Sequence, residues 1–146
     1  MDDWRVNFPE TLMPTRRAVG TIAGWTIVWL MTLMLVFVFG VQGFAKFSDS
    51  SGWATAFAHW GYPVWFRMLI GVLEVGAAAL LIWPRTAPIG AAIIVVVMLG
   101  GMGTHIVKNG GRHITSEIVP LVFASVILFA RREQLPRFSA RRAVTA

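Results

Sequence analysis

Long apolar runs constrain most strongly what this chain can fold into. Three of them have the length and composition of membrane-crossing helices, which need about 20 mostly apolar residues. A fourth run is shorter and more polar, but it also lacks the alternation typical of membrane β-strands. We therefore expect an all-α fold, a membrane four-helix bundle with four transmembrane helices. The expected spans are residues 22–45, 64–83, 86–107 and 114–130.

The overall composition agrees with a membrane protein. Of the 146 residues, 56% are hydrophobic and only 14% are charged, and the mean hydropathy is +0.66. A soluble domain of this size needs more charged residues to cover its surface. The lipid bilayer is therefore the first expected partner. The chain contains no cysteine, which excludes disulfides, thiolate metal sites and dithiol redox chemistry.

The first span could instead be read as a cleaved signal peptide. Its apolar run is longer than the roughly 7–15 residues of a signal-peptide core, so a retained helix is the better interpretation. We divide the chain into a cytoplasmic N-terminal segment, a transmembrane domain and a basic cytoplasmic tail. These are residues 1–21, 22–130 and 131–146.

Basic residues predict the orientation, because they concentrate on the cytoplasmic side of membrane proteins. They cluster in both tails and in the link between the second and third spans, whereas the two other loops carry only Lys46, Lys108 and Arg112. We expect both termini in the cytoplasm of a bacterial or archaeal cell, and Asp49 and Asn109 outside the plasma membrane. The net charge is +6. Because the basic residues flank apolar spans, this charge indicates no nucleic-acid partner.

The first outer loop is expected to contain a short interfacial helix. Trp53, Phe57 and Trp60 recur at helical spacing and share one face. An aromatic face is typical of a helix that lies in the membrane interface. Two interpretations stay open: the aromatic face fixes only the depth of the helix, or it covers a pocket.

Polar residues of the spans fall into one layer in the outer half of the membrane. A rise of about 1.5 Å per residue places Glu74 roughly 15 Å deep and the other members nearer the outer surface. We expect Glu74 and His105 to be catalytic and the others to bind a ligand. The other members are Gln42, Lys46, Arg67 and Glu117.

Glu74 is the most informative member of this layer. A carboxylate at that depth is too short to reach the surface, so it must be protonated, paired or hydrated. We expect it to form the floor of an outward-facing polar pocket, although an internal ion pair that only fixes helix packing is the alternative. Arg67 shares its helix face and is long enough to reach the surface.

Metal sites are not expected. Met98, Met102 and His105 share a helix face and suit copper(I) chemically. Methionine is more often a filler of apolar gaps, and no methionine-rich loop could supply such a site. We expect no metal and no covalently bound cofactor.

Four short motifs resemble the DoxX family of four-helix membrane proteins. They are "GFAK" at the end of the first span, "WGYP" after the outer loop, "GVLEVG" in the second span and "MGTH" in the third. The resemblance covers about residues 22–130. It implies a bacterial or archaeal membrane protein, and relatives include the membrane subunit of a thiosulfate:quinone oxidoreductase. The recurrent polar positions of the family match Lys46, Glu74 and His105.

Residues and resemblance together predict a small subunit of a membrane oxidoreductase assembly that holds a quinone-like ligand in the outer polar layer. Such a subunit needs redox-protein partners, because the sequence shows no electron carrier of its own. Two alternatives stay open: a non-redox binding or transport protein for a lipophilic small molecule, and a purely structural membrane subunit. The sequence also leaves homo-oligomerisation open.

Overall fold

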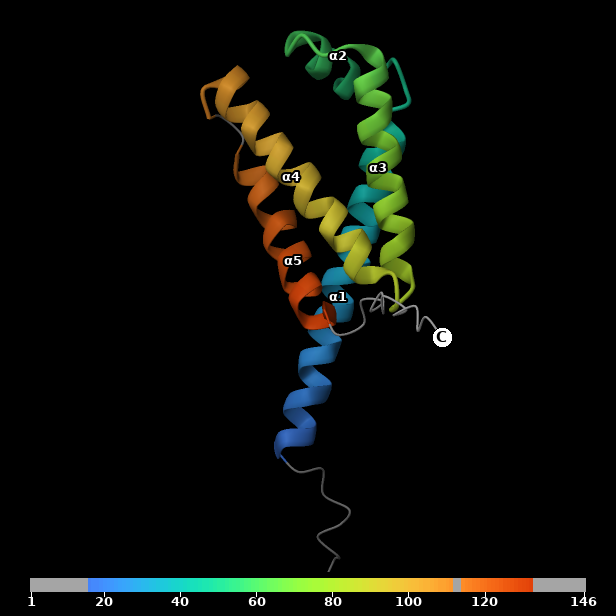
Figure 1. The fold of residues 1–146 in the computed structure, drawn as a ribbon, viewed down its shortest axis with the longest axis vertical. Coiled ribbons are helices and arrows are strands. Elements are labelled where there is room, and N and C mark those ends of the chain that lie inside the picture. Colours follow the sequence, from blue (N-terminus) through green and yellow to red (C-terminus); the bar gives the residue numbers. More distant parts are fainter. Residues whose placement is uncertain (1–15, 112–113, 133–146) are drawn as a thin grey trace, which may run out of the picture.

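The computed structural model describes residues 16–111 and 114–132, with side chains described from residue 23 onward. All regular structure in these residues is helical, which confirms the expected all-α fold (Figure 1). The helices are α1 (Arg16–Ala45), α2 (Gly52–His59), α3 (Val64–Ile82), α4 (Ala87–Asn109) and α5 (Thr115–Arg131).

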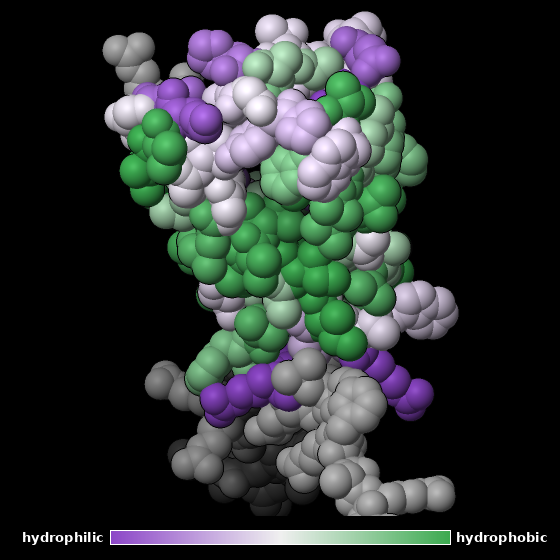
Figure 2. Space-filling view, turned by 45° about the horizontal axis from the view of Figure 1, so that its top comes forward, coloured by the Kyte–Doolittle hydropathy of each residue, from purple (hydrophilic) through white to green (hydrophobic). Residues whose placement is uncertain are grey.

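Three of these helices are long and apolar enough to cross a membrane, over Ala23–Ala45, Val64–Ile82 and Ala87–Asn109. Helix α5 has 17 residues and falls just short of that length, so a fourth span stays a prediction. On the face shown in Figure 2, a broad apolar zone lies between hydrophilic residues at the two ends of the described bundle. Large apolar side chains such as Phe37, Trp65 and Val96 are exposed on the described surface. Lipid tails can cover such a surface, whereas water would make it costly.

The four long helices form a bundle in which three of the four neighbouring pairs pack extensively. Helix α1 packs on α3, α3 on α4 and α4 on α5, while α1 and α5 touch less extensively. The short helix α2 lies across one end of the bundle and packs on α3 (Figure 1). We call this end the α2 end. The apolar core includes Leu35, Ala77, Leu81, Ile94 and Ile127, each at most 1% exposed.

The expected helix positions agree with the structure apart from their ends. Helix α1 begins at Arg16, so the last six residues of the expected N-terminal segment are helical. Residues 1–15 and most of the expected basic tail lie outside the described residues. Helix α2 forms where the aromatic spacing predicts a short helix, although its place at a membrane surface stays a prediction.

Glycines allow α1 and α3 to approach closely. A Cβ atom on Gly43 would lie 2.8 Å from Cγ2 of Val75, and a Cβ atom on Gly71 would lie 3.0 Å from the carbonyl oxygen of Gly43. Contacts this short force neighbouring atoms to move. Small residues at such crossings let helix backbones pack closely in membranes. Gly43 precedes Lys46 by three residues, and Gly71 precedes Glu74 by three residues. The close approach of the two helices therefore positions Lys46 and Glu74.

Replacement of Gly43 by leucine is expected to destabilise the bundle by about 1–3 kcal/mol, the usual cost of overpacking a filled interface. Gly40 provides a matched control on the same helix, because a Cβ atom there would meet nothing within 4 Å. Thermal unfolding in mild detergent compares the two variants. Equal melting temperatures for Gly43→Leu and Gly40→Leu would contradict this account of the crossing.

Candidate functional site

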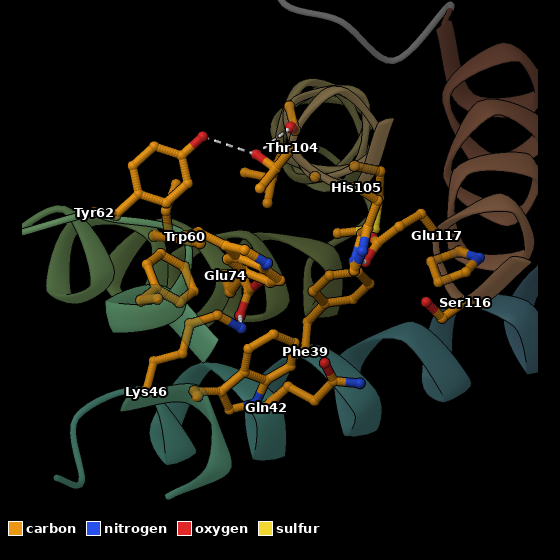
Figure 3. Close-up of a pocket in the computed structure, with 18 of the residues that line it drawn as sticks. Phe39, Gln42, Lys46, Trp60, Tyr62, Glu74, Thr104, His105, Ser116 and Glu117 are labelled. Carbon is orange, nitrogen blue, oxygen red and sulfur yellow. Dashed lines mark hydrogen bonds and ion pairs between the residues drawn. The ribbon is translucent and has the colours of Figure 1, made fainter. Parts of the chain in front are cut away.

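A cavity of about 520 Å³ lies at the α2 end. All five helices contribute to its wall, and Figure 3 shows polar side chains from α1, α3, α4 and α5 pointing into it. The volume is within the usual range of small-molecule sites, about 300–1,000 Å³. Five of the six sequence-predicted site residues line it: Gln42, Lys46, Glu74, His105 and Glu117.

Lys46 and Glu74 form an ion pair inside this cavity. Nζ of Lys46 donates a hydrogen bond of 2.6 Å to Oε2 of Glu74, and the two side chains are 3% and 4% exposed. Lys46 follows the last residue of α1, and its long side chain reaches down to Glu74 in α3 (Figure 3). A buried carboxylate is tolerated when a partner compensates its charge. The ion pair with Lys46 therefore compensates the charge of the buried Glu74 carboxylate.

The ammonium group of Lys46 also lies over an aromatic ring. Its Nζ is 3.8 Å from the centroid of Trp53 in α2, a geometry that stabilises a cation. Burial lowers the pKa of Lys46 below its usual value, and the neighbouring Glu74 carboxylate opposes part of that shift. A lysine with a lowered pKa gives up its proton more readily than one in water. Lys46 can therefore serve as a hydrogen-bond donor and as a proton donor.

A chain of hydrogen bonds orients His105. Nε1 of Trp60 donates to Oδ1 of Asn109 at 3.1 Å, because an indole N–H can only donate. This bond turns Nδ2 of Asn109 toward Nδ1 of His105, also at 3.1 Å. Nδ1 must then accept, so the neutral imidazole carries its proton on Nε2. The tautomer of His105 is thus fixed from α2 through Asn109.

The protonated nitrogen of His105 faces a second carboxylate. Nε2 of His105 lies 3.6 Å from Oε1 of Glu117 in the first turn of α5, which is longer than an ordinary hydrogen bond. Gly101 makes room for this carboxylate, because a Cβ atom there would lie 3.3 Å from Cδ of Glu117. His105 and Glu117 therefore lie side by side in the cavity wall.

Aromatic rings from α2 and the following loop cover the cavity. We call Trp53, Phe57, Trp60 and Tyr62 the aromatic cover. Phe57 is buried and its ring contacts those of the other three. All four residues line the cavity. This arrangement favours the interpretation in which the aromatic face of α2 covers a pocket.

Two hydrogen bonds attach the aromatic cover to α4. One is the Trp60–Asn109 bond. In the other, the Tyr62 hydroxyl lies 3.1 Å from Oγ1 of Thr104 (Figure 3). Thr104 donates its own proton to the carbonyl oxygen of Gly100, so Tyr62 is the donor. Sequence reasoning gave no role to Asn109, Tyr62 or Thr104, because nothing in their local spacing indicates that the loop folds back over α4.

Arg67 is the one predicted site residue that does not line the cavity. Its guanidinium group donates to the carbonyl oxygen of Ser48 at 3.0 Å and pairs with the carboxylate of Asp49. Both partners belong to the loop between α1 and α2. The structure therefore gives Arg67 a role in holding this loop rather than a contact with the cavity.

Gln42 lies at the edge of the cavity. Its side chain belongs to α1 and is exposed, although the position falls within a membrane-spanning helix. An exposed amide in an apolar environment lowers its free energy by finding a hydrogen-bond partner. Gln42 is well placed to contact a ligand that extends out of the cavity.

The arrangement combines apolar walls with convergent polar groups. Aromatic rings can hold a flat ring-shaped molecule, and Lys46 and His105 present N–H donors to it. Glu74 and Glu117 are paired with these two donors and can exchange protons with them. Among residues 16–111 and 114–132, no group of three or more His, Asp or Glu side chains could hold a metal ion. The cavity is therefore suited to bind a small molecule with hydrogen-bond acceptors and to transfer protons to it.

Comparison with known proteins places this architecture in a family. The model of the DoxX-like family matches residues 30–130. The uncharacterized protein YdgD of Bacillus subtilis (strain 168) is 41% identical over 46 residues, which cover 30% of this chain and 40% of that protein. No solved structure matches the chain significantly. Because the family match spans more than half of the sequence and includes every residue of the cavity wall, the chain belongs to the DoxX-like family.

Proposed function

We propose that this protein binds the headgroup of a quinone-like molecule in the cavity at the α2 end and acts as a small subunit of a membrane oxidoreductase assembly. The observation that carries the proposal is the cavity itself, in which a buried Lys46–Glu74 pair and an oriented His105 meet aromatic walls. The neighbouring hollow between α1 and α5 is smaller, about 220 Å³.

The chemistry of a quinone fits these groups. A quinone ring is flat and apolar on its faces, and its carbonyl oxygens accept hydrogen bonds at its edge. The aromatic cover supplies flat apolar contacts, while Lys46 Nζ and His105 Nε2 supply donors at opposite sides of the wall. Full reduction to the quinol adds two electrons and two protons. Glu74 and Glu117 can resupply the protons that Lys46 and His105 deliver.

We propose that the electrons for this reduction come from another protein. The sequence contains no cysteine, so it cannot hold a cysteine-bound iron–sulfur cluster. We propose a partner subunit that carries a flavin, a haem or an iron–sulfur cluster. If no such partner exists, the same cavity would serve a non-redox binding or transport protein for a lipophilic molecule.

We also propose that α5 forms the fourth span and that the α2 end faces the outside of the plasma membrane. Exposed arginines Arg85 and Arg132 lie at the opposite end of the bundle, where the positive-inside tendency predicts the cytoplasm. In this cysteine-free chain, Ser50→Cys and Lys108→Cys should react with an impermeant maleimide on intact cells. Arg85→Cys should react only after the membrane is broken. The reverse pattern would place the cavity on the cytoplasmic side.

Purification from the native membrane in mild detergent tests the function. We expect mass spectrometry to find a quinone in the extracted lipids and a redox protein among the co-purifying chains. A quinone without a redox partner would favour the non-redox binding protein. A preparation with neither, from a folded and lipid-retaining sample, would contradict the proposal.

A further inference from the structure

A second hollow lies on the outside of the bundle between α1 and α5. Its volume is about 220 Å³, and it occupies the side where these two helices touch least extensively. Four residues line both this groove and the large cavity: Val38, Gln42, Ser116 and Pro120. The groove and the cavity therefore share one wall, and we call the groove the lateral groove.

The polarity of the lateral groove changes along its length. Gln42, Thr115 and Ser116 lie at its end near the α2 end of the bundle, and Met34, Leu35 and Phe123 lie at the other end. Met34 and Gln42 are eight residues apart on α1, which corresponds to about 12 Å along the helix. The groove thus leads from polar groups beside the cavity to purely apolar groups deeper in the bundle.

The lateral groove is open to the surroundings of the bundle. Met34 and Val119, one on each side, are both 47% exposed, and Leu35 forms a buried floor at 1%. Met34 and Val119 are exposed apolar side chains on α1 and α5, so lipid is the phase expected to meet this opening. The α2 end is less accessible, because the aromatic cover lies over the cavity there and bonds to Asn109 and Thr104.

We infer that the ligand of the cavity is an amphiphile that enters sideways from the lipid, with its polar ring in the cavity and a single apolar tail in the lateral groove. This inference rests on the proposed function and specifies its ligand class: a ring with hydrogen-bond acceptors that carries a long hydrocarbon substituent. Gln42 lies where the ring joins the tail, and its exposed amide faces the polar part of the molecule. Molecules without a tail fit the cavity but leave the groove to lipid.

Val119→Trp tests this route, because an indole at that position fills the groove without replacing any group of the large cavity. Val122→Trp is the matched control, since Val122 is on the same helix, is 49% exposed and does not line the groove. The probes are a benzoquinone with a decyl tail and the same ring without a tail. Binding is measured on the full-length protein in detergent, as the rise in melting temperature with ligand concentration.

We expect both probes to stabilise the wild type and the Val122→Trp control. Val119→Trp should bind the tailless ring as the wild type does and the decyl quinone at least about tenfold more weakly, which corresponds to about 1.4 kcal/mol. Met34→Trp, on the opposite wall, should give the same pattern. Unchanged binding of the decyl quinone by both groove variants would overturn lateral entry and leave the proposed function standing. A wild type that binds neither probe would overturn the proposed function, and this inference with it.

Discussion

Replacement of Lys46 by methionine is expected to lower the free energy of unfolding by about 3–5 kcal/mol, the usual cost of removing one partner from a buried ion pair. Methionine keeps the length of the apolar stem but removes the ammonium group that compensates Glu74. The carboxylate, only 4% exposed, must then either stay charged without a partner or take up a proton. The cation–π contact with Trp53 is lost as well.

The double variant Lys46→Met/Glu74→Gln separates the charge from the packing. We expect it to recover most of the lost stability, because replacing both members of a buried pair by neutral groups is often close to neutral. Unfolding titrations of the four proteins complete a double-mutant cycle. If Lys46→Met were as stable as the wild type, the pair would contribute little and Glu74 would need another explanation.

Replacement of Glu74 by glutamine is expected to reduce proton-coupled turnover of the native assembly by about 10²–10⁴-fold, the usual contribution of a positioned acid or base. The amide oxygen of glutamine can still accept the hydrogen bond from Lys46, so the chain should insert and fold. An amide does not titrate at accessible pH, however, so in the proposed function it could not resupply a proton that Lys46 gives to the ligand.

The matched control is Asp49→Asn, which makes the same change in a carboxylate that is 88% exposed and outside the cavity. It should leave turnover nearly unchanged. Quinone reduction by membranes that contain each variant, normalised to the amount of folded protein, gives the comparison. Full turnover with Glu74→Gln would reduce Glu74 to a packing residue, which is the structural alternative for this carboxylate.

Part of the site is predictable from the sequence because Glu74 lies inside an apolar span. A charge in such a place needs a partner, so the position of Glu74 alone indicates either a pocket or an ion pair. The structure contains both, since the pair with Lys46 lines the cavity. The depth estimate does not predict this pairing, because it places the backbone of Lys46 near the surface and neglects the length of a lysine side chain.

The contacts that depend on the loop after α2 were not predictable. Trp60 and Asn109 are 49 residues apart in the sequence, and their bond exists because the residue that follows α2 lies beside the end of α4. The partner of Arg67 was not predictable either. Its helix face and its depth are compatible with a ligand contact, but the turn between α1 and α2 brings Asp49 within reach and engages the guanidinium group.

Helix α5 contains a feature whose structural consequence the sequence does not predict. Pro120 lies inside α5, and a proline in a helix removes one backbone hydrogen bond and commonly bends the helix. The sequence shows this weak point but not its consequence. In the structure Pro120 lines both the cavity and the lateral groove. It lies on the side of α5 that faces α1, which α5 contacts less extensively than it contacts α4.

Photolabelling with an azidoquinone tests most directly whether the cavity at the α2 end is a quinone site. The wild-type protein is irradiated with the probe in lipid nanodiscs, and the modified residues are identified by mass spectrometry with and without excess unlabelled quinone. If the cavity is the quinone site, labels that excess quinone prevents are expected on cavity residues such as Trp53, Gln42 and Thr104. Labels confined to outward-facing residues such as Val96 and Phe129, which are 68% and 67% exposed, and unaffected by competitor would contradict it.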